Sequence, residues 1–317
     1  MTWSRREVLK LSAALLADGG HHFMVSPPQS AVLAAGGRME RMRTRPIPRT
    51  GEQLPVIGMG TYRTFDVGDS EEARRPLREV LRRLFEGGGR VIDSSPMYGR
   101  AEQVVGELLE PAQRPFLATK VWATGREEGI AQMRRSMRLM APRADRPFDL
   151  MQIHNLVDWR THLPTLRDWK EAGTIRYWGI THYTDAAFGE MEAIVRTEKP
   201  DFVQLPYSVG AREAEKRLLP ACAEHGVAVL VERPFEAGSL FRDTLKRPLP
   251  AWAAEMDCAS WAQVFLKFIL GHPAVTCPIP ATSNPEHMAD DVRAGYGRLP
   301  DEPLRRRIVA EVTGASR

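Results

Sequence analysis

The chain of 317 residues has little cysteine and no long apolar run, and each absence excludes a class of protein. Its three cysteines, Cys222, Cys258 and Cys277, are scattered and form no CxxC pair, so neither a disulfide framework nor a zinc site is indicated. We expect three buried thiols, with a single disulfide as the alternative. The apolar run near the N-terminus is far too short to cross a bilayer, so stable membrane insertion is not expected.

The body of the chain also lacks an excess of charge. The whole chain carries a net charge of +4, but residues 1–49 alone carry +5, which leaves −1 for residues 50–317. No stripe of Lys and Arg interleaved with aromatic residues is present, so nucleic acid is not expected as a partner. The length and the 43% hydrophobic content fit a soluble α/β barrel or two smaller domains. The oligomeric state cannot be inferred from the sequence.

The N-terminus carries most of the positive charge. Ser4–Lys10 contains a twin arginine, and the short apolar run Leu11–Ala17 follows it, which resembles a Tat export signal. We therefore expect residues 1–45 to be a leader and linker, with Arg45–Pro48 still in the linker, and residues 46–317 to be the folded domain. A Tat signal implies a periplasmic protein. The alternative is a disordered basic tail on a cytoplasmic protein.

From Leu54 onward, short apolar runs alternate with amphipathic stretches, which indicates β–α units around a parallel sheet. The predicted strands are Val56–Met59, Arg90–Asp93, Phe116–Val121, Leu150–His154, Tyr177–His182, Phe202–Pro206, Val227–Glu232 and Val275–Ile279. The predicted helices are Glu71–Glu86, Ala101–Glu110, Glu127–Met140, Arg160–Ala172, Ala186–Arg196, Ala214–His225, Ala259–Leu270 and Pro285–Ala294. Eight such units predict a single-domain α/β protein with a (β/α)8 TIM barrel. No GxGxxG segment joins a strand to a helix, which disfavours a doubly wound dinucleotide fold.

Ionisable side chains occur at the ends of three neighbouring predicted strands. Asp93 ends the second strand, Lys120 lies in the third, His154 ends the fourth, and Tyr98 follows Asp93 in a loop. Each has a simpler interpretation when taken alone: Asp93 as a helix cap, Tyr98 as a half-buried aromatic, Lys120 as a solvated edge residue and His154 as a hydrogen-bonded one. Together they indicate a functional site at the C-terminal mouth of the barrel.

These four residue types suit the reduction of a carbonyl group. A phenol with a pKa near 10 is a weak acid at neutral pH, and a neighbouring ammonium group is expected to lower that pKa. We therefore expect Lys120 to lower the pKa of Tyr98, and Asp93 to pair with Lys120 and orient it. Tyr98 could then protonate a carbonyl oxygen, which a neutral His154 would polarise.

With these four residues the chain resembles an aldo-keto reductase. Asp93, Tyr98, Lys120 and His154 match the Asp/Tyr/Lys/His tetrad of that family in order and spacing, and the resemblance covers roughly Pro46–Arg293. It implies an NAD(P)H-dependent enzyme that reduces aldehydes or ketones by hydride transfer, with NADPH as cofactor and NADH as the alternative. The cofactor-binding residues that it implies, from motif matches along the chain, are Gly60, Thr61, Tyr62, Asp93, Thr181, His182, Gln204, Thr282, His287, Asp290 and Asp291.

The chain also departs from the family pattern. Glu232 stands where an aromatic side chain often stacks on the nicotinamide, with Phe235 or Tyr207 as candidates to replace it. Ala281 and His287 stand where basic residues often bind a 2′-phosphate. A second hypothesis is therefore a nicotinamide-binding accessory or regulatory subunit with little turnover. No metal site is predicted, because no cluster of acidic and His ligands lies on several strand ends.

Overall fold

The computed structural model describes residues 41–142, 146–244 and 246–314. The twin-arginine motif and most of the predicted leader therefore lie outside the described residues.

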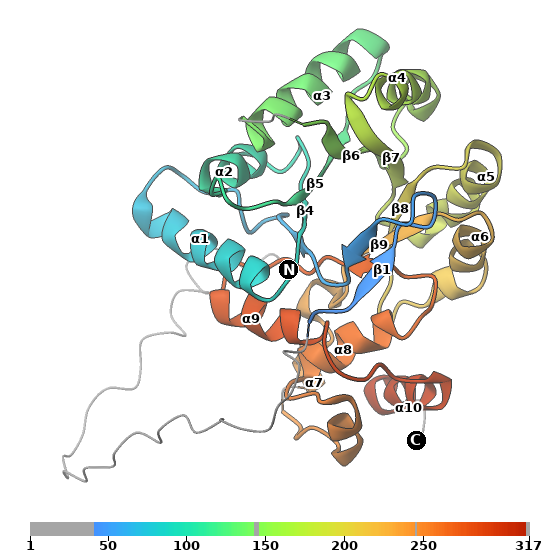
Figure 1. The fold of residues 1–317 in the computed structure, drawn as a ribbon. Coiled ribbons are helices and arrows are strands. Elements are labelled where there is room, and N and C mark those ends of the chain that lie inside the picture. Colours follow the sequence, from blue (N-terminus) through green and yellow to red (C-terminus); the bar gives the residue numbers. More distant parts are fainter. Residues whose placement is uncertain (1–40, 143–145, 245, 315–317) are drawn as a thin grey trace, which may run out of the picture. The chain divides into compact units, whose positions relative to one another are not determined.

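Within the described residues, eight parallel strands pair in chain order around a barrel (Figure 1). They are β3 (Met59–Gly60), β4 (Val91–Asp93), β5 (Phe116–Val121), β6 (Phe148–His154), β7 (Ile175–Thr181), β8 (Phe202–Pro206), β9 (Ala228–Glu232) and β10 (Cys277–Pro278). The first and last strands meet where the N–H groups of Gly58 and Gly60 donate to the carbonyls of Pro278 and Pro280, at 3.1 and 2.9 Å. The predicted (β/α)8 barrel is confirmed.

Helices follow the barrel strands and cover their outer faces (Figure 1). They are α1 (Glu71–Glu86), α2 (Ala101–Leu108), α3 (Arg126–Met140), α4 (Trp159–Glu171), α5 (Phe188–Glu198), α6 (Leu218–Glu224), α8 (Trp261–Leu270) and α9 (Pro285–Arg293). The helix predicted over 214–225 is instead split into η3 (Glu213–Glu215) and α6. Pro220 explains the break, because it has no N–H to donate and is tolerated only in the first turn of a helix.

The segment Arg45–Pro48 is not a linker, as the sequence had suggested. Strand β1 (Thr44–Pro46) pairs antiparallel with β2 (Gln53–Pro55), and Ile47 in the connecting turn is fully buried. Ile47 and Leu54 join the apolar cluster inside the barrel, so this hairpin closes its N-terminal end. The two prolines favoured linker in the sequence, but both are compatible with a short edge strand.

One further helix is absent from the set predicted from the sequence. It is α10 (Glu302–Thr313). Pro303 lies in the first turn, where a missing N–H costs no intrahelical hydrogen bond, and Asp301 caps the helix by accepting from the N–H of Leu304 at 3.1 Å.

The long segment after β9 contains η4 (Glu236–Gly238), α7 (Phe241–Thr244) and η5 (Ala251–Met256). All three cysteines are free and buried, as predicted. No helix in the described ranges is long and apolar enough to span a bilayer.

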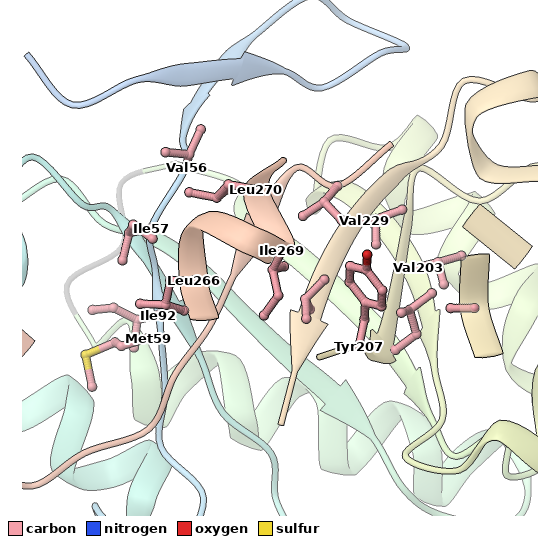
Figure 2. Packing of buried hydrophobic residues seen from close by; sticks show 14 of the residues in the cluster. Val56, Ile57, Met59, Ile92, Val203, Tyr207, Val229, Leu266, Ile269 and Leu270 are labelled. Atoms are coloured by element: carbon pink, nitrogen blue, oxygen red, sulfur yellow. The ribbon is translucent and has the colours of Figure 1, made fainter. Parts of the chain in front are cut away.

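Alternate residues of each strand face the helices or the barrel interior. The outer face packs on the helices, and Figure 2 shows Leu266, Ile269 and Leu270 of α8 among the strand residues of this layer. The inner face carries a separate apolar cluster, which includes Phe116, Leu150 and Phe202. The centroids of the Phe116 and Phe202 rings are 5.7 Å apart. This cluster fills the barrel below its C-terminal mouth and supports the residues above it.

Candidate active site

The polar residues at the mouth continue the inward-facing positions of the strands. In β5, Phe116 and Ala118 belong to the interior cluster, and Lys120 follows at the next inward position. The same spacing of two places Asp93 after Val91 in β4 and places Gln152 and His154 after Leu150 in β6. The barrel interior therefore changes from apolar to polar toward the carboxyl ends of its strands, where barrel enzymes carry their chemistry. 

Lys120 and Asp93 form an ion pair that is closed to solvent. Their residues are 0% and 2% exposed, and the Lys120 ammonium donates to Asp93 Oδ1 and Oδ2 at 2.8 and 2.7 Å. Its third hydrogen goes to the carbonyl of Ser94 at 2.6 Å. All three donors of the ammonium are thus used within this corner of the barrel. Burial raises the pKa of Asp93, and the charge of Lys120 opposes that rise.

Tyr98 reaches the same corner from the loop between β4 and α2. The Lys120 Nζ atom lies 5.5 Å from the centroid of its ring, and the edge of the His154 ring meets it at a centroid distance of 5.9 Å. Tyr62 packs on the other side at 5.0 Å. The structure therefore brings together the four residues Asp93, Tyr98, Lys120 and His154 that the sequence singled out.

The predicted lowering of the pKa of Tyr98 is wrong. Burial raises the pKa of the Tyr98 phenol, and the negative charges of Asp93 and Glu232 raise it further. The hydrogens of Lys120 are donated to Asp93 and Ser94. Tyr98 therefore holds its proton firmly at neutral pH.

His154 is neutral, as the sequence analysis expected. Burial lowers its pKa to about 3, and the charge of Lys120 contributes. Its Nδ1 atom is 3.0 Å from the hydroxyl of Ser95, which follows Asp93 in the same loop. If the Ser95 hydroxyl donates to Nδ1, the remaining hydrogen is on Nε2 and is available as a donor.

A chain of amide side chains links this corner to β9. Gln152 Nε2 donates to Asp93 Oδ1 at 3.2 Å and to Gln204 Oε1 at 2.8 Å. Gln204 Nε2 donates to Asp93 Oδ2 at 3.3 Å and to Glu232 Oε2 at 3.0 Å. Gln152 was not among the predicted site residues, although its spacing of two from His154 would have indicated it. The amide nitrogen and the amide oxygen of Gln204 are thus both engaged within this chain.

The remaining predicted residues near the mouth have separate positions. Thr61 is buried, and its hydroxyl lies 3.1 Å from the carbonyl of Asp93. Tyr62 is half exposed beside Tyr98. Thr181 is paired in register with His154 and Gln204, and His182 stacks on Tyr183. Gly60 lies opposite Asp93 in the β3–β4 register. This group borders the corner formed by Asp93, Tyr98, Lys120 and His154.

The C-terminal residues of the predicted cofactor set lie on the segment after β10 and on α9. Thr282 accepts from the N–H of Asn284 at 3.0 Å, and His287 is exposed. Asp290 accepts from Ser260 and Gln263 at 2.5 and 2.6 Å, at the start of α8. Asp291 is buried, which raises its pKa well above the usual value. Asp290 is thus held by two side chains, those of Ser260 and Gln263.

Tyr207 cannot replace the aromatic side chain expected at the position of Glu232. It is fully buried, its hydroxyl is bonded to Arg305 at 2.5 Å and to Glu215, and its ring packs against Phe268. Figure 2 shows Tyr207 within the buried apolar cluster. Phe235 packs on Phe241, with ring centroids 5.0 Å apart, but is only half-buried, so its stacking on the nicotinamide stays a prediction.

The loops that follow β7, β8 and β9 surround a hollow of about 600 Å3. Arg212 and Arg233 line it, together with Tyr183 and Glu236. The Glu236 carboxylate is held by the hydroxyl of Ser208 at 2.5 Å. The carboxylates of Asp185 and Glu213 also line it, so guanidinium and carboxylate groups face the same hollow. No group of three or more metal-ligating side chains occurs in the part of the chain that the structure describes.

Comparisons with known proteins agree with this architecture. The sequence profile of the Aldo/keto reductase family matches residues 56–307. Methylglyoxal reductase YeaE of Escherichia coli (strain K12) is 28% identical over 256 residues, which cover 78% of this chain and 88% of that protein. The NADH-specific methylglyoxal reductase of the same organism is 24% identical over 229 residues, covering 63% of this chain and 69% of that protein.

A solved aldo/keto reductase from Klebsiella pneumoniae, in complex with NADP and acetate, has the same fold. It superposes with a TM-score of 0.71 at 23% identity, covering 85% of this chain and 95% of that one. Since the family profile spans most of the sequence, the chain belongs to the aldo/keto reductase family.

Proposed function

We propose that the protein is an NAD(P)H-dependent oxidoreductase that reduces aldehydes or ketones. The observation that carries this proposal is the convergence of a protonated phenol, a buried ammonium–carboxylate pair and a neutral imidazole at the mouth of the barrel. Such a set donates a proton and a hydrogen bond to one oxygen while stabilising the charge that develops there.

Each of the four residues has a distinct role in this proposal. Tyr98 gives its proton to the carbonyl oxygen, and its raised pKa keeps it protonated until that moment. His154 orients and polarises the same oxygen as a neutral donor. Lys120 lies over the ring of Tyr98, where its ammonium balances the charge of Asp93. Asp93 accepts two hydrogen bonds from that ammonium and holds it in place.

The residues at the mouth fit a nicotinamide cofactor, which when bound supplies the hydride. Gly60, Thr61, Tyr62, Thr181 and His182 border the corner that it must reach, together with Asp93 and Gln204. Two buried acceptor atoms there, Gln152 Oε1 and Glu232 Oε1, have no partner in the described ranges. Arg212 and Arg233 in the adjoining hollow suit its pyrophosphate. Thr282, His287, Asp290 and Asp291 remain candidates for its adenosine end. NADPH is proposed as the cofactor, and NADH is the alternative.

The named relatives suggest where to look for a substrate. Two of them are methylglyoxal reductases, and the chain covers 88% and 69% of their lengths. We therefore propose small reactive aldehydes, with methylglyoxal as the first to test.

The proposal is tested by titrating the purified protein with NADPH and NADH, following cofactor fluorescence, and by then adding methylglyoxal or 4-nitrobenzaldehyde. Saturable binding with cofactor oxidation supports it. Absence of binding of both cofactors contradicts it.

A second candidate is a nicotinamide-binding accessory subunit with little turnover. Two observations favour it: Glu232 occupies the position of the expected aromatic, and the pKa of Tyr98 is raised rather than lowered. Tight cofactor binding without oxidation by any reactive aldehyde would favour this candidate over the enzyme.

We also propose that the Tat-like N-terminus exports the folded protein to the periplasm. Cell fractionation of the full chain tests this, because an Arg5→Lys/Arg6→Lys variant should then stay in the cytoplasm. Equal distribution of the two forms would contradict export.

A further inference from the structure

One acidic side chain at the mouth has no role in the reaction proposed above. Glu232 ends β9, and its Oε2 accepts from Gln204 Nε2 at 3.0 Å. Its Oε1 is buried and has no hydrogen-bond partner within the described part of the chain. A buried carboxylate oxygen without a partner is costly, so its retention needs a reason.

Burial raises the pKa of Glu232, and the charge of Lys120 opposes that rise without a direct hydrogen bond to the carboxylate. The three hydrogens of that ammonium go to the two oxygens of Asp93 and to the carbonyl of Ser94. Arg233 is the next residue, but its Nη1 atom is 3.5 Å from the carbonyl of Tyr183. The corner therefore contains two acids, Asp93 and Glu232, for one buried ammonium.

The additional carboxyl group, that of Glu232, affects the electrostatic potential beside Tyr98. The charge of Glu232 is close enough to raise the pKa of the Tyr98 phenol, as that of Asp93 does. A hydride donor must approach the carbonyl carbon whose oxygen faces Tyr98, so its ring lies within the same field. The oxidised nicotinamide ring is a cation, whereas the reduced ring is neutral, and only the cation gains from a nearby carboxylate.

We propose that Glu232 makes the site selective for the oxidised form of the cofactor, and so favours hydride release from the reduced form. This inference rests on the proposed NAD(P)H-dependent function. By linkage, tighter binding of the oxidised form shifts the equilibrium on the protein toward the oxidised cofactor and the reduced substrate. Glu232 acts here through the ring charge and is a specificity-determining residue of the cofactor site.

The test is calorimetric titration of the full-length protein with NADP+ and with NADPH, for the native protein and for Glu232→Gln. The substitution keeps the size and the capacity to bond Gln204 but removes the charge. We expect it to weaken NADP+ binding relative to NADPH by about tenfold, because a nearby unit charge is only partly screened in such a site. An unchanged ratio of the two dissociation constants would overturn the proposal.

A control variant and titrations of the native protein at several pH values test the proposal further. Glu255→Gln removes an exposed carboxylate from η5, in the same long segment after β9, and should leave the ratio unchanged. In the native protein the ratio should favour NADP+ increasingly as pH rises, because Glu232 then loses its proton more readily beside the cation. This series needs no variant, and a flat ratio over the range would also overturn the proposal.

The other groups that face Glu232 behave differently in that series. Asp93 is paired with Lys120, and the raised pKa of Tyr98 keeps the phenol neutral. Glu232→Gln should therefore flatten the dependence on pH. If neither cofactor form binds the native protein, both the proposed function and this inference fall. If both bind with the same ratio in the native protein and the variant, only the inference falls.

Discussion

Replacing Lys120 by Met should destabilise the fold in a way that depends on pH. Lys120 is 0% exposed and Asp93 2% exposed, so the substitution leaves a carboxylate buried without its ammonium. The remaining donors to Asp93 are the amides of Gln152 and Gln204, at the longer distances of 3.2 and 3.3 Å. Removal of one partner of such a buried pair costs about 3–5 kcal/mol in the free energy of unfolding.

The sign of the pH dependence follows from the same geometry. Burial already raises the pKa of Asp93 with Lys120 present, and without Lys120 nothing opposes that rise. A group whose pKa is higher in the folded than in the unfolded chain binds more protons when folded, so its contribution to stability is present at low pH and is lost as pH rises through the folded pKa. The deficit of Lys120→Met should therefore be larger at about pH 8 than at about pH 5.

Guanidinium denaturation of both proteins at the two pH values measures this. The double variant Asp93→Asn/Lys120→Met serves as control and should recover part of the loss at the higher pH, because no unpaired Asp93 carboxylate remains. A deficit under about 1 kcal/mol, the size expected of an exposed pair, would refute the reasoning. So would a deficit that is the same at both pH values.

Three further predictions concern the fold and the protonation of the site. Ile47→Ala, in the turn of the hairpin that closes the barrel, should cost about 2–5 kcal/mol in denaturant unfolding, and a loss under about 1 kcal/mol would contradict the burial. The imidazole of His154 should show no titration by proton NMR between about pH 5 and pH 8, because its pKa is lowered to about 3; stability gained from keeping it neutral is present above the unfolded pKa of about 6.5 and is lost as pH falls toward 3. Cys222, Cys258 and Cys277 should be inert to an aromatic disulfide reagent until the protein is denatured, since all are buried and the pKa of Cys222 is raised to about 12; rapid reaction of the native protein would contradict this.

Local patterns in the sequence were enough to predict the barrel and the residues at its mouth. Asp93, Lys120 and His154 were singled out because each is an ionisable residue at or near the end of a predicted strand, where a barrel brings its functional residues together. In the folded strands Lys120 follows Ala118 on the inward face, and His154 follows Leu150 and Gln152. Gln152 was overlooked because it is not ionisable.

The features that the sequence did not predict depend on contacts between distant segments. The hairpin of β1 and β2 forms because Ile47 and Leu54 reach the barrel interior, while Pro46 and Pro48 resemble a linker when considered alone. The pKa of Tyr98 depends on its burial and on the nearby charges of Asp93 and Glu232, which no spacing in the sequence reveals. Whether the pKa of such a side chain is raised or lowered thus depends on the folded site.

The most direct test of the proposed function is single-turnover oxidation of bound NADPH by 4-nitrobenzaldehyde in the native protein and in Tyr98→Phe. The substitution removes the proton donor but keeps the ring between Tyr62 and His154, so cofactor binding should be unchanged. We expect rapid oxidation in the native protein and a loss of at least about a hundredfold in the variant, the usual range for a general acid. Equal rates in the two proteins would contradict Tyr98 as the proton donor, and no oxidation in either would favour the accessory subunit.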